Sequence, residues 1–310
     1  MKALFDALSR QSFKDFEIIF INCDCATAKK TAQYVHLYTE LSITIISSSP
    51  LLPGDARNLG VSHAAANLIT FLDMRTIPHD EWLESTFTLK ANGSFDIVLG
   101  KFICATFNPM QEYIKAATFG HSSSNSLPGS LLTAEVFQHV GNFLSDARAG
   151  EDEEWLNRVH LKNFSVGYMP RETLTYVGLP ISLSALSKKW FFYSIKSAPI
   201  NVAQSQKEAY FFVFSLFLIY FFFNWNYFLT NNQWDQSPFF IPHINKIIWS
   251  MSLLIYLIVR GFIIPFKKGV KKTFLLPFNW LILSLISMII DISKFPGRVL
   301  GYIYYLRSKF

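Results

Sequence analysis

The chain has 310 residues, of which 51% are hydrophobic and 16% aromatic, and its formal net charge is +6. The apolar residues concentrate after position 209, which predicts a soluble half followed by a membrane half rather than two soluble domains. A positive charge suits either nucleic acid or an anionic bilayer. Many of the lysines flank apolar segments, and the sequence has neither a zinc-finger spacing nor a continuous basic stripe, so nucleic acid is not expected as a partner.

The three cysteines, Cys23, Cys25 and Cys104, are too few for a disulfide framework or a closed zinc site. We expect them to be reduced thiols in a cytosolic domain. Residues 1–13 contain no long apolar segment of the secretory type. Membrane insertion is therefore expected to depend on the C-terminal segments.

Helical and extended patterns alternate along the first hundred residues. The expected helices cover residues 2–10, 29–38 and, after a turn and N-cap signal at 53–55, 56–66; the expected strands cover residues 16–21, 42–46, 68–72 and 95–104. This alternation predicts an α/β fold with a mostly parallel sheet flanked by helices on both faces. The polar residues 121–128 are expected to form a mobile loop.

An acidic run at residues 151–154 follows Gly150 and precedes an apolar helical face. If the run opens a helix, Glu151 and Asp152 lie at the positive end of the helix dipole, which favours their ionised forms. An ionised carboxylate at the mouth of a site can act as a general base. The alternative is a solvated acidic helix start.

Asp73 follows the expected strand 68–72, and ligands of open α/β sheets bind at the carboxyl ends of strands. The position therefore favours a role in chemistry. The alternative is that Asp73 caps a helix that begins after residue 80.

Six short motifs together resemble family 2 inverting glycosyltransferases in their order and spacing. They are FEIIFI at 16–21, ARNLG at 56–60, FLD at 71–73, PGS at 128–130, VGNF at 140–143 and GED at 150–152. The resemblance covers about residues 1–180 and implies a nucleotide-sugar-binding domain of the GT-A type.

The resemblance also implies roles for individual residues. Asp73 matches the Asp-X-Asp element at the donor diphosphate, where a divalent metal such as Mg²⁺ or Mn²⁺ is expected. Asp152, next to Glu151, matches the catalytic base that deprotonates the acceptor hydroxyl. Arg57 matches an arginine near the donor phosphates.

The sequence departs from the family pattern at three places. The family normally opens with an apolar strand, which is not found here, and we expect the natural protein to begin upstream of Met1. The acidic pair that usually follows the next strand is replaced by Asn22 and Cys23, with Asp24 displaced, so Asn22 and Asp24 are the candidates for donor contacts.

The third departure is Arg75, which replaces the second acid of Asp-X-Asp. A guanidinium cannot bind a metal, but it can bind a diphosphate directly. We therefore expect Arg75 to reduce the dependence on metal. The alternative is that Arg75 pairs with Asp80 or Glu81 while Asp73 still holds the metal.

The remaining chain has the character of a membrane region. We expect a catalytic domain at residues 1–185, an interfacial amphipathic connection at 186–208 and a membrane region at 209–310. Lys188, Lys189 and Trp190 either contact phosphate or acceptor, or anchor a helix at the headgroup level.

Three apolar segments, at residues 209–229, 247–265 and 273–290, each approach the ~20 residues needed to cross a bilayer. The connection 266–272 carries four lysines, which places it on the cytosolic side with the catalytic domain. Three full spans would put the basic tail outside, so we expect the third segment to be tilted or re-entrant.

These features predict a multi-pass enzyme of the inner or plasma membrane with a cytosolic catalytic domain. It would transfer a sugar from a nucleotide-diphosphate sugar to a lipid-linked glycan in polysaccharide or glycolipid assembly. The main alternative is a non-catalytic membrane scaffold that has lost donor binding. A processive synthase is a weaker alternative, because few apolar segments are available to build a pore.

Overall fold

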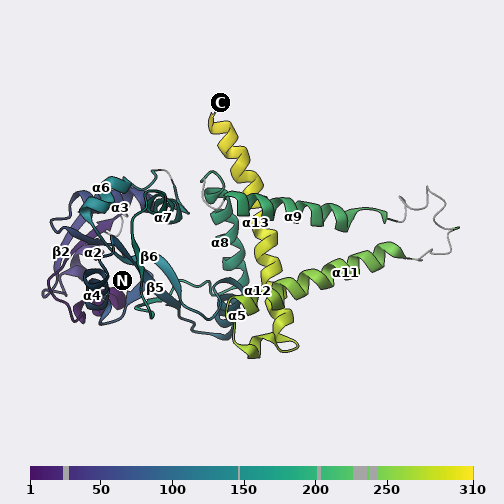
Figure 1. Cartoon of the computed structure of the whole chain (residues 1–310), viewed down its shortest axis with the longest axis horizontal. Helices are drawn as coiled ribbons and strands as arrows, with labels where there is room; N and C mark the ends of the chain where they lie inside the picture. Colours follow the sequence, from purple (N-terminus) through teal and green to yellow (C-terminus); the bar gives the residue numbers. More distant parts are fainter. Residues whose placement is uncertain (24–27, 146, 201–203, 226–235, 237–242, 310) are drawn as a thin grey trace.

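The computed structural model describes residues 1–23, 28–145, 147–200, 204–225, 236 and 243–309. An α/β domain occupies the N-terminal half, and long helices follow it (Figure 1). Two of these helices, α9 (Gln204–Phe222) and α11 (Ile244–Ile258), extend side by side away from the domain (Figure 1).

The main sheet has six strands and is mixed. Its order is β3-β6-β5-β8-β4, and β7 pairs with β5. The strands are β3 (Leu68–Thr70), β4 (Thr76–Pro78), β5 (Ile97–Cys104), β6 (Ser124–Thr133), β7 (Val166–Tyr168) and β8 (Leu174–Tyr176). β5 is parallel to β7 and β8, but β6 is antiparallel to both β3 and β5, and β4 is antiparallel to β8. The α/β class is confirmed, whereas the expectation of a mostly parallel sheet is corrected.

The cause of this correction is the segment expected to be a loop at residues 121–128. Its second half belongs to β6, which pairs with β5 through a register shift between Val98 and Gly100. A Cβ on Gly100 would lie 2.3 Å from the carbonyl oxygen of Pro128, so only glycine allows the two strands to approach here. The loop prediction was wrong because backbone pairing with β5 outweighs the polar side chains of the segment.

The first two strands form a separate two-stranded parallel sheet. β1 (Glu17–Asn22) pairs with β2 (Ser42–Ser47), and the helices α1 (Lys2–Ser9) and α2 (Ala28–Val35) precede them in turn. Buried residues of α1 and α2 pack with those of α4 (Trp82–Gly93) in one apolar cluster. The sheet interruption between β1 and β3 is the main irregularity of the fold.

A second apolar cluster joins the main sheet to α6 (Ala134–Val140) and α7 (Glu151–Leu161). Trp155 of α7 is fully buried there and lies 5.2 Å from Phe143 between ring centroids. This packing fixes the position of the helix that carries the acidic run. α3 (Pro53–Ser62) starts with a proline, which suits the first turn of a helix.

The C-terminal helices run in two directions in Figure 1. α13 (Asn279–Lys309) lies along α8 (Leu183–Ser197) and across α9 and α11. After α11, the helix continues through a π-helical turn, η2 (Val259–Ile263), into α12 (Ile264–Lys267). The short helix η3 (Lys272–Leu275) precedes α13.

Two helical stretches, Ile244–Lys267 and Asn279–Arg307, are long and apolar enough to cross a membrane, and residues Phe211–Tyr220 form a shorter apolar helix. Part of the expected first segment, at 226–229, lies outside the described residues. The expected third segment, at 273–290, is divided between η3 and α13, and α13 continues through the basic residues of the tail to Lys309.

Glycines on α13 bring it close to α8. A Cβ on Gly297 would lie 2.5 Å from the carbonyl oxygen of Phe191, and one on Gly301 would lie 2.5 Å from that of Ile195. Ser187 and Ser293 are hydrogen-bonded between the two helices at 2.8 Å. Small residues at a helix contact permit such close backbone approach. The two helices therefore form one packed unit.

Candidate active site

Arg57 joins three of the predicted site segments. From α3, its Nη1 donates to Glu151 Oε1 at 2.8 Å and its Nη2 donates to Asp73 Oδ1 at 3.2 Å. The side chains of Arg57 and Glu151 are only 11% and 6% exposed, whereas Asp73 is 50% exposed. The guanidinium also lies over the Phe143 ring, 5.4 Å from its centroid. The three charged residues form one cluster that is open on the Asp73 side.

The predicted motifs hold this cluster in place through backbone contacts. Asn58, next to Arg57, exchanges two hydrogen bonds with the backbone of Phe143, at 2.8 and 3.0 Å. Trp155 Nε1 donates to the carbonyl oxygen of Gly141 at 2.8 Å, and Arg158 donates to those of Val140 and Asn142. These bonds fasten the 140–143 segment to α3 and α7 at once.

The acidic run opens helix α7, as predicted. Gly150 precedes the helix with a φ of 88°, a left-handed conformation that favours glycine. Glu151 turns inward to Arg57, while Asp152 is partly exposed and accepts a hydrogen bond from the Glu153 amide at 2.9 Å. Adjacent acids therefore have different surroundings, with one paired and buried and the other accessible.

Burial and charge shift the pKa values of this cluster. Burial alone would lower the pKa of Arg57, but the carboxylates of Asp73, Glu151 and Asp152 outweigh it and raise that pKa. Burial, followed by the charge of Asp152, raises the pKa of Glu151 above its ordinary value even though Arg57 acts in the opposite sense. Arg57 thus stays positively charged in the site. Its guanidinium holds the Glu151 side chain in place.

Asp73 and Arg75 lie at the end of the segment that follows β3. The carbonyl oxygen of Asp73 accepts from the Thr76 amide at 2.9 Å, so its backbone closes a turn while its side chain faces Arg57. Asp73 does not cap α4, which begins at Trp82.

Arg75 is exposed, and its backbone oxygen accepts from the Val177 amide at 2.9 Å. The suggested partners of its side chain are engaged elsewhere: Asp80 pairs with Arg10 and Glu81 with Arg171. Within the described part of the chain, no ion pair includes Arg75.

Asn22 and Asp24 are the two remaining candidates for contacts with the donor. Asn22 is buried at the end of β1, where its carbonyl oxygen accepts from the Ser48 amide at 3.1 Å. Asp24 lies outside the described residues. The strand end predicted to carry donor contacts is therefore described only up to Cys23.

A residue of α8 reaches the acidic run. Burial, together with the charges of Glu153, Asp152 and Glu151, raises the pKa of Tyr193 well above its ordinary value. A Cβ on Gly150 would lie 4.0 Å from the Cβ of Ser197, the last residue of α8, which also places the end of this helix against the start of α7. Sequence reasoning missed Tyr193, although the aromatic run 190–193 was the signal for it.

The predicted acceptor residues on α8 have mainly structural neighbours. Lys189 Nζ lies 5.7 Å from the Tyr176 ring centroid, and Trp190 packs on Tyr193 at 5.6 Å between ring centroids. The Trp190 ring also receives Lys294 Nζ at 4.0 Å from its centroid. Lys188 is exposed on the same helix. These contacts pack Lys189 and Trp190 against the α/β domain and α13, and their proposed contacts with phosphate, acceptor or lipid headgroups stay predictions.

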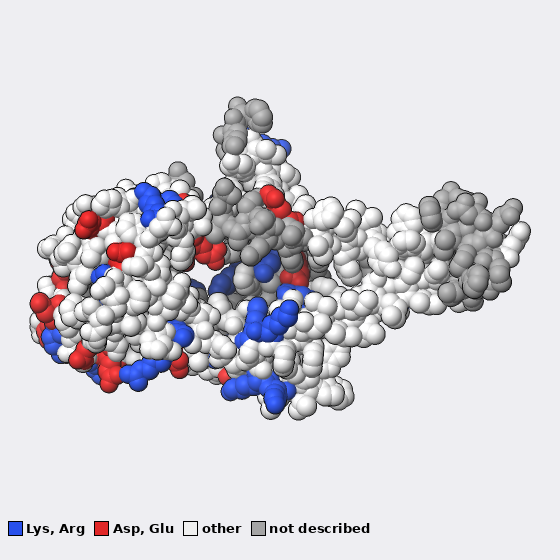
Figure 2. All heavy atoms as spheres, in the orientation of Figure 1, with Lys and Arg blue, Asp and Glu red and all other residues white. Residues whose placement is uncertain are grey.

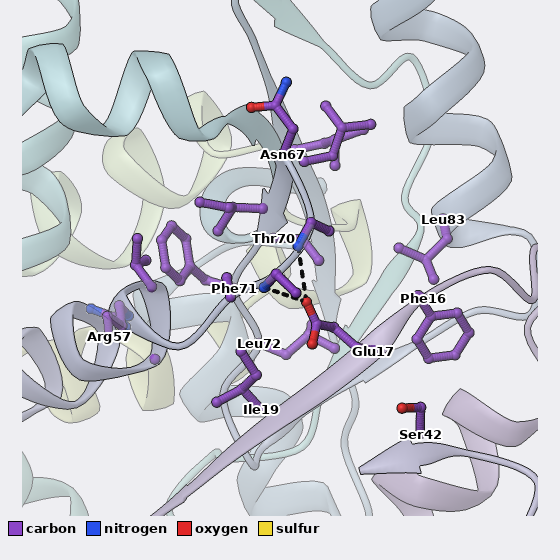
Figure 3. Close-up of a pocket in the computed structure, with 18 of the residues that line it drawn as sticks. Phe16, Glu17, Ile19, Ser42, Arg57, Asn67, Thr70, Phe71, Leu72 and Leu83 are labelled. Atoms are coloured by element: carbon purple, nitrogen blue, oxygen red, sulfur yellow. Dashed lines mark hydrogen bonds between the residues drawn. The ribbon is translucent and has the colours of Figure 1, made fainter. Parts of the chain in front are cut away.

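Positive charge accumulates where α8 and α13 meet α12. Arg260, Lys268 and Arg298 all act electrostatically on Lys294, and Asp291 is the acid that acts on it among the described residues. Figure 2 shows that the surface is hollowed between the α/β domain and these helices, and that charged side chains of both signs line the hollow.

Existing contacts hold three of these cations in place. Arg260 Nε lies 2.7 Å from Asp291 Oδ2, and Lys268 Nζ donates to the carbonyl oxygen of Thr118 at 2.6 Å. Lys294 is held by the Trp190 ring. Lysines and arginines thus outnumber acids among the described groups that act on Lys294, which suits this region to an anion.

The residues near Asp73 fit a magnesium-type site only in part. Mg²⁺ is commonly held by one or two carboxylates together with substrate phosphates, and Asp73 supplies one exposed carboxylate. Among the described residues, no group of three or more His, Cys, Asp or Glu side chains could hold a metal ion. A metal here would therefore depend on the donor phosphates for most of its ligands.

A family model described as glycosyl transferase family 2 matches residues 1–143. The amylovoran biosynthesis glycosyltransferase AmsB of Erwinia amylovora is 33% identical over 87 residues, which are 27% of this chain. That match spans 29% of the length of AmsB.

Among solved structures, TarS residues 1–349 from S. aureus in complex with UDP-GlcNAc is similar with a TM-score of 0.47 and 13% identity. The similarity covers 96% of this chain and 86% of that chain. The same part of TarS in complex with UDP has a TM-score of 0.46, at 13% identity and the same coverage of both chains.

Proposed function

Because residues 1–143 form a family 2 glycosyltransferase domain, we propose that the chain transfers a sugar from a nucleotide-diphosphate sugar to a lipid-linked glycan at the membrane, with inversion. The observation that carries this proposal is the Arg57 cluster, in which one cation joins Asp73 and Glu151 while Asp152 stays accessible. Residues 1–185 are the catalytic part, 186–208 the interfacial connection and 209–310 the membrane part.

The transfer is a single displacement at the anomeric carbon. The acceptor oxygen forms a bond to that carbon as the bond to the diphosphate breaks, and the electron pair leaves with the nucleoside diphosphate. Asp152 takes the proton of the attacking hydroxyl as the general base. Glu151 is a positioning residue, because its carboxylate is occupied by Arg57.

Arg57 and Arg75 stabilise the departing diphosphate. Both guanidinium groups are permanent cations, and their geometry matches phosphate oxygens. Asp73 would hold a divalent metal, which when bound supplies further positive charge to the leaving group. The adjacent arginines reduce the dependence on this ion. Asn22 and Asp24 complete the donor side.

The acceptor side faces α8 and the basic cluster. An acceptor carried on a lipid phosphate would bring an anion to Lys294 and Arg298 while its sugar reaches Asp152 past Tyr193. The two candidate membrane helices support a place at the bilayer. The partial similarity to an amylovoran biosynthesis enzyme supports a role in polysaccharide assembly.

The main alternative is a scaffold that has lost donor binding. The intact acidic pair of Glu151 and the accessible Asp152 supports the enzyme, because a scaffold has no need of a base.

The test is incubation of membranes containing the chain with a panel of labelled nucleotide sugars, together with calorimetry of nucleotide binding to the purified chain. We expect one donor to bind and its label to enter the lipid fraction. Failure to bind any nucleotide would favour the scaffold.

A further inference from the structure

The helix α13 runs across the hairpin formed by α9 and α11 rather than along it (Figure 1). Contacts between them lie at the base of the hairpin. Phe211 and Phe214 of α9 pack on the Phe295 ring, with ring centroids 5.1 and 5.2 Å away. Tyr256, near the end of α11, donates to Asp291 Oδ2 at 2.8 Å. Membrane-spanning helices tilt by about 20° on average, so helices that cross in this way do not both span one bilayer.

The charged residues of α13 distinguish it from the hairpin. Residues 209–223 and 247–259, which form most of the hairpin, contain no charged side chain. α13 instead carries three charged residues in the middle of its apolar stretch: Asp291, Lys294 and Arg298. Ionised side chains at the centre of a bilayer are costly and rare. The hairpin therefore suits the bilayer interior, and α13 does not.

One edge of α13 is nevertheless apolar and exposed. On its buried side, Ile286 and Ile290 share an apolar cluster with Ile114 of α5 (Pro109–Thr118) and Leu186 of α8. Four exposed apolar residues follow one another at intervals of 4, 7 and 11 positions, which places them on one edge of the helix: Leu281, Leu285, Ile292 and Ile303. A continuous apolar surface of this kind marks a site of contact with a membrane or another apolar partner.

Basic and aromatic residues flank α13 at both ends. The connection that leads into it exposes three lysines, Lys267, Lys271 and Lys272, together with Phe266, Leu276 and Phe278. Tyr304 and Arg307 are exposed near its other end. Lysine, arginine and aromatic side chains in this mixture are typical of the headgroup level, where the cations attract anionic lipids. The charge and the apolar edge together favour an anionic bilayer surface as the partner.

We propose that α13 lies along the surface of the bilayer, with its exposed apolar edge at the boundary between headgroups and acyl chains, and that it neither crosses the bilayer nor enters it part-way. Both ends of the helix are then on the same side as Lys271. This inference rests on the proposed place at the bilayer and does not depend on sugar transfer.

The test measures the depth of single cysteines along the exposed edge. Leu281→Cys, Ile292→Cys and Ile303→Cys are made in a chain whose Cys23 and Cys25 are replaced by serine, while the buried Cys104 is retained. Leu254→Cys, exposed near the middle of Ile244–Lys267, is the matched control for a spanning helix. Each variant carries a nitroxide label in vesicles of phosphatidylethanolamine and phosphatidylglycerol, and its accessibility to oxygen and to a water-soluble nickel complex gives the depth.

We expect the three α13 labels at one shallow depth, within about 10 Å of the headgroup boundary, as is usual for a surface helix, and the Leu254→Cys label deeper. An Ile292→Cys label as deep as the control, with shallow labels at the other two positions, would show that α13 spans and would overturn the proposal. Labels on α13 that are shielded from both reagents would overturn it as well, because protein would then cover the edge.

The control also separates this inference from the proposed function. If the Leu254→Cys label lies in water, the place at the bilayer fails, and the proposal fails with it. If that label is deep, the result at Ile292→Cys tests α13 alone. Arg307→Cys gives an independent readout with an impermeant thiol reagent. Labelling from the same side as Lys271→Cys supports the proposal, and labelling from the opposite side refutes it.

Discussion

At the scale of single residues, Asp152 and Glu151 show how one helix start can place two adjacent acids in different surroundings. Asp152→Asn removes the proposed base but leaves the Arg57 contacts intact. We expect transfer to fall by ~10²–10⁴, the usual effect of losing a general base, while calorimetry shows unchanged donor binding. Glu153→Gln, at the next position, is the matched control. Near-normal turnover of Asp152→Asn would remove Asp152 from this role.

The Arg57–Glu151 pair predicts a stability effect that depends on pH. Arg57→Gln leaves a buried carboxylate without its cation, and we expect a loss of ~3 kcal/mol in the free energy of unfolding at neutral pH. Glu151 already has a raised pKa, and losing Arg57 raises it further. A raised folded pKa favours the folded state at low pH, so the loss should shrink as pH falls through that pKa.

This dependence is measured by denaturant titration in detergent between neutral pH and pH 5. Arg10→Gln is the control, since its pair with Asp80 is exposed and should contribute under ~1 kcal/mol. An Arg57→Gln loss that stays constant over this range, or one that Glu151→Gln does not relieve in the double variant, would contradict the buried-pair argument.

Arg75 predicts how strongly transfer depends on metal. With a cation fixed in the chain, we expect the unaltered enzyme to keep measurable transfer in a chelator. Arg75→Asp should lose that activity and recover when manganese is added. Arg171→Ala, an exposed arginine paired with Glu81, is the control. Complete loss of wild-type activity in chelator, together with a fully active Arg75→Ala, would make the arginine a bystander.

At the scale of elements, the α8–α13 contact depends on glycine. Gly297→Val would force a side chain against the carbonyl oxygen of Phe191, and overpacking of this kind costs ~1–3 kcal/mol. We expect a lower unfolding midpoint and reduced transfer, because α8 also contacts the start of α7. Ile292→Val, on an exposed part of α13, should leave both quantities unchanged. Normal transfer by Gly297→Val would show that this contact does not support the site.

The helices and strands that could be predicted from the sequence are those whose patterns lie within a few neighbouring residues. Helix α7 begins at the predicted glycine, and β1 and β2 lie within a residue of their expected ends, because capping and apolar runs act over a few positions. β6 could not be predicted from the sequence, since its polar half is extended only because it pairs with β5. The Arg57–Glu151 bond joins positions 94 residues apart, and no local pattern encodes such a contact.

At the scale of the whole molecule, the hairpin of α9 and α11 predicts the membrane topology. We expect the chain to stay in the membrane pellet after alkaline carbonate extraction. Lys271→Cys should gain labelling by an impermeant thiol reagent in inside-out vesicles, and Gln236→Cys in intact cells, each relative to the unaltered chain. Labelling of both positions from one side would contradict a hairpin that spans the bilayer.

The upright pair of α8 and α13 has a further consequence for the proposed reaction. These helices stand between the hairpin and the acidic start of α7 (Figure 1), so in the proposed topology, with the hairpin of α9 and α11 in the bilayer, they set the distance of Asp152 from it. An acceptor with its lipid held at the base of the hairpin presents one hydroxyl at that distance. Once a sugar is attached, the new terminal hydroxyl stands farther out than the base can reach. We therefore expect the proposed enzyme to add a single sugar to each acceptor, and a longer chain of sugars to need further enzymes.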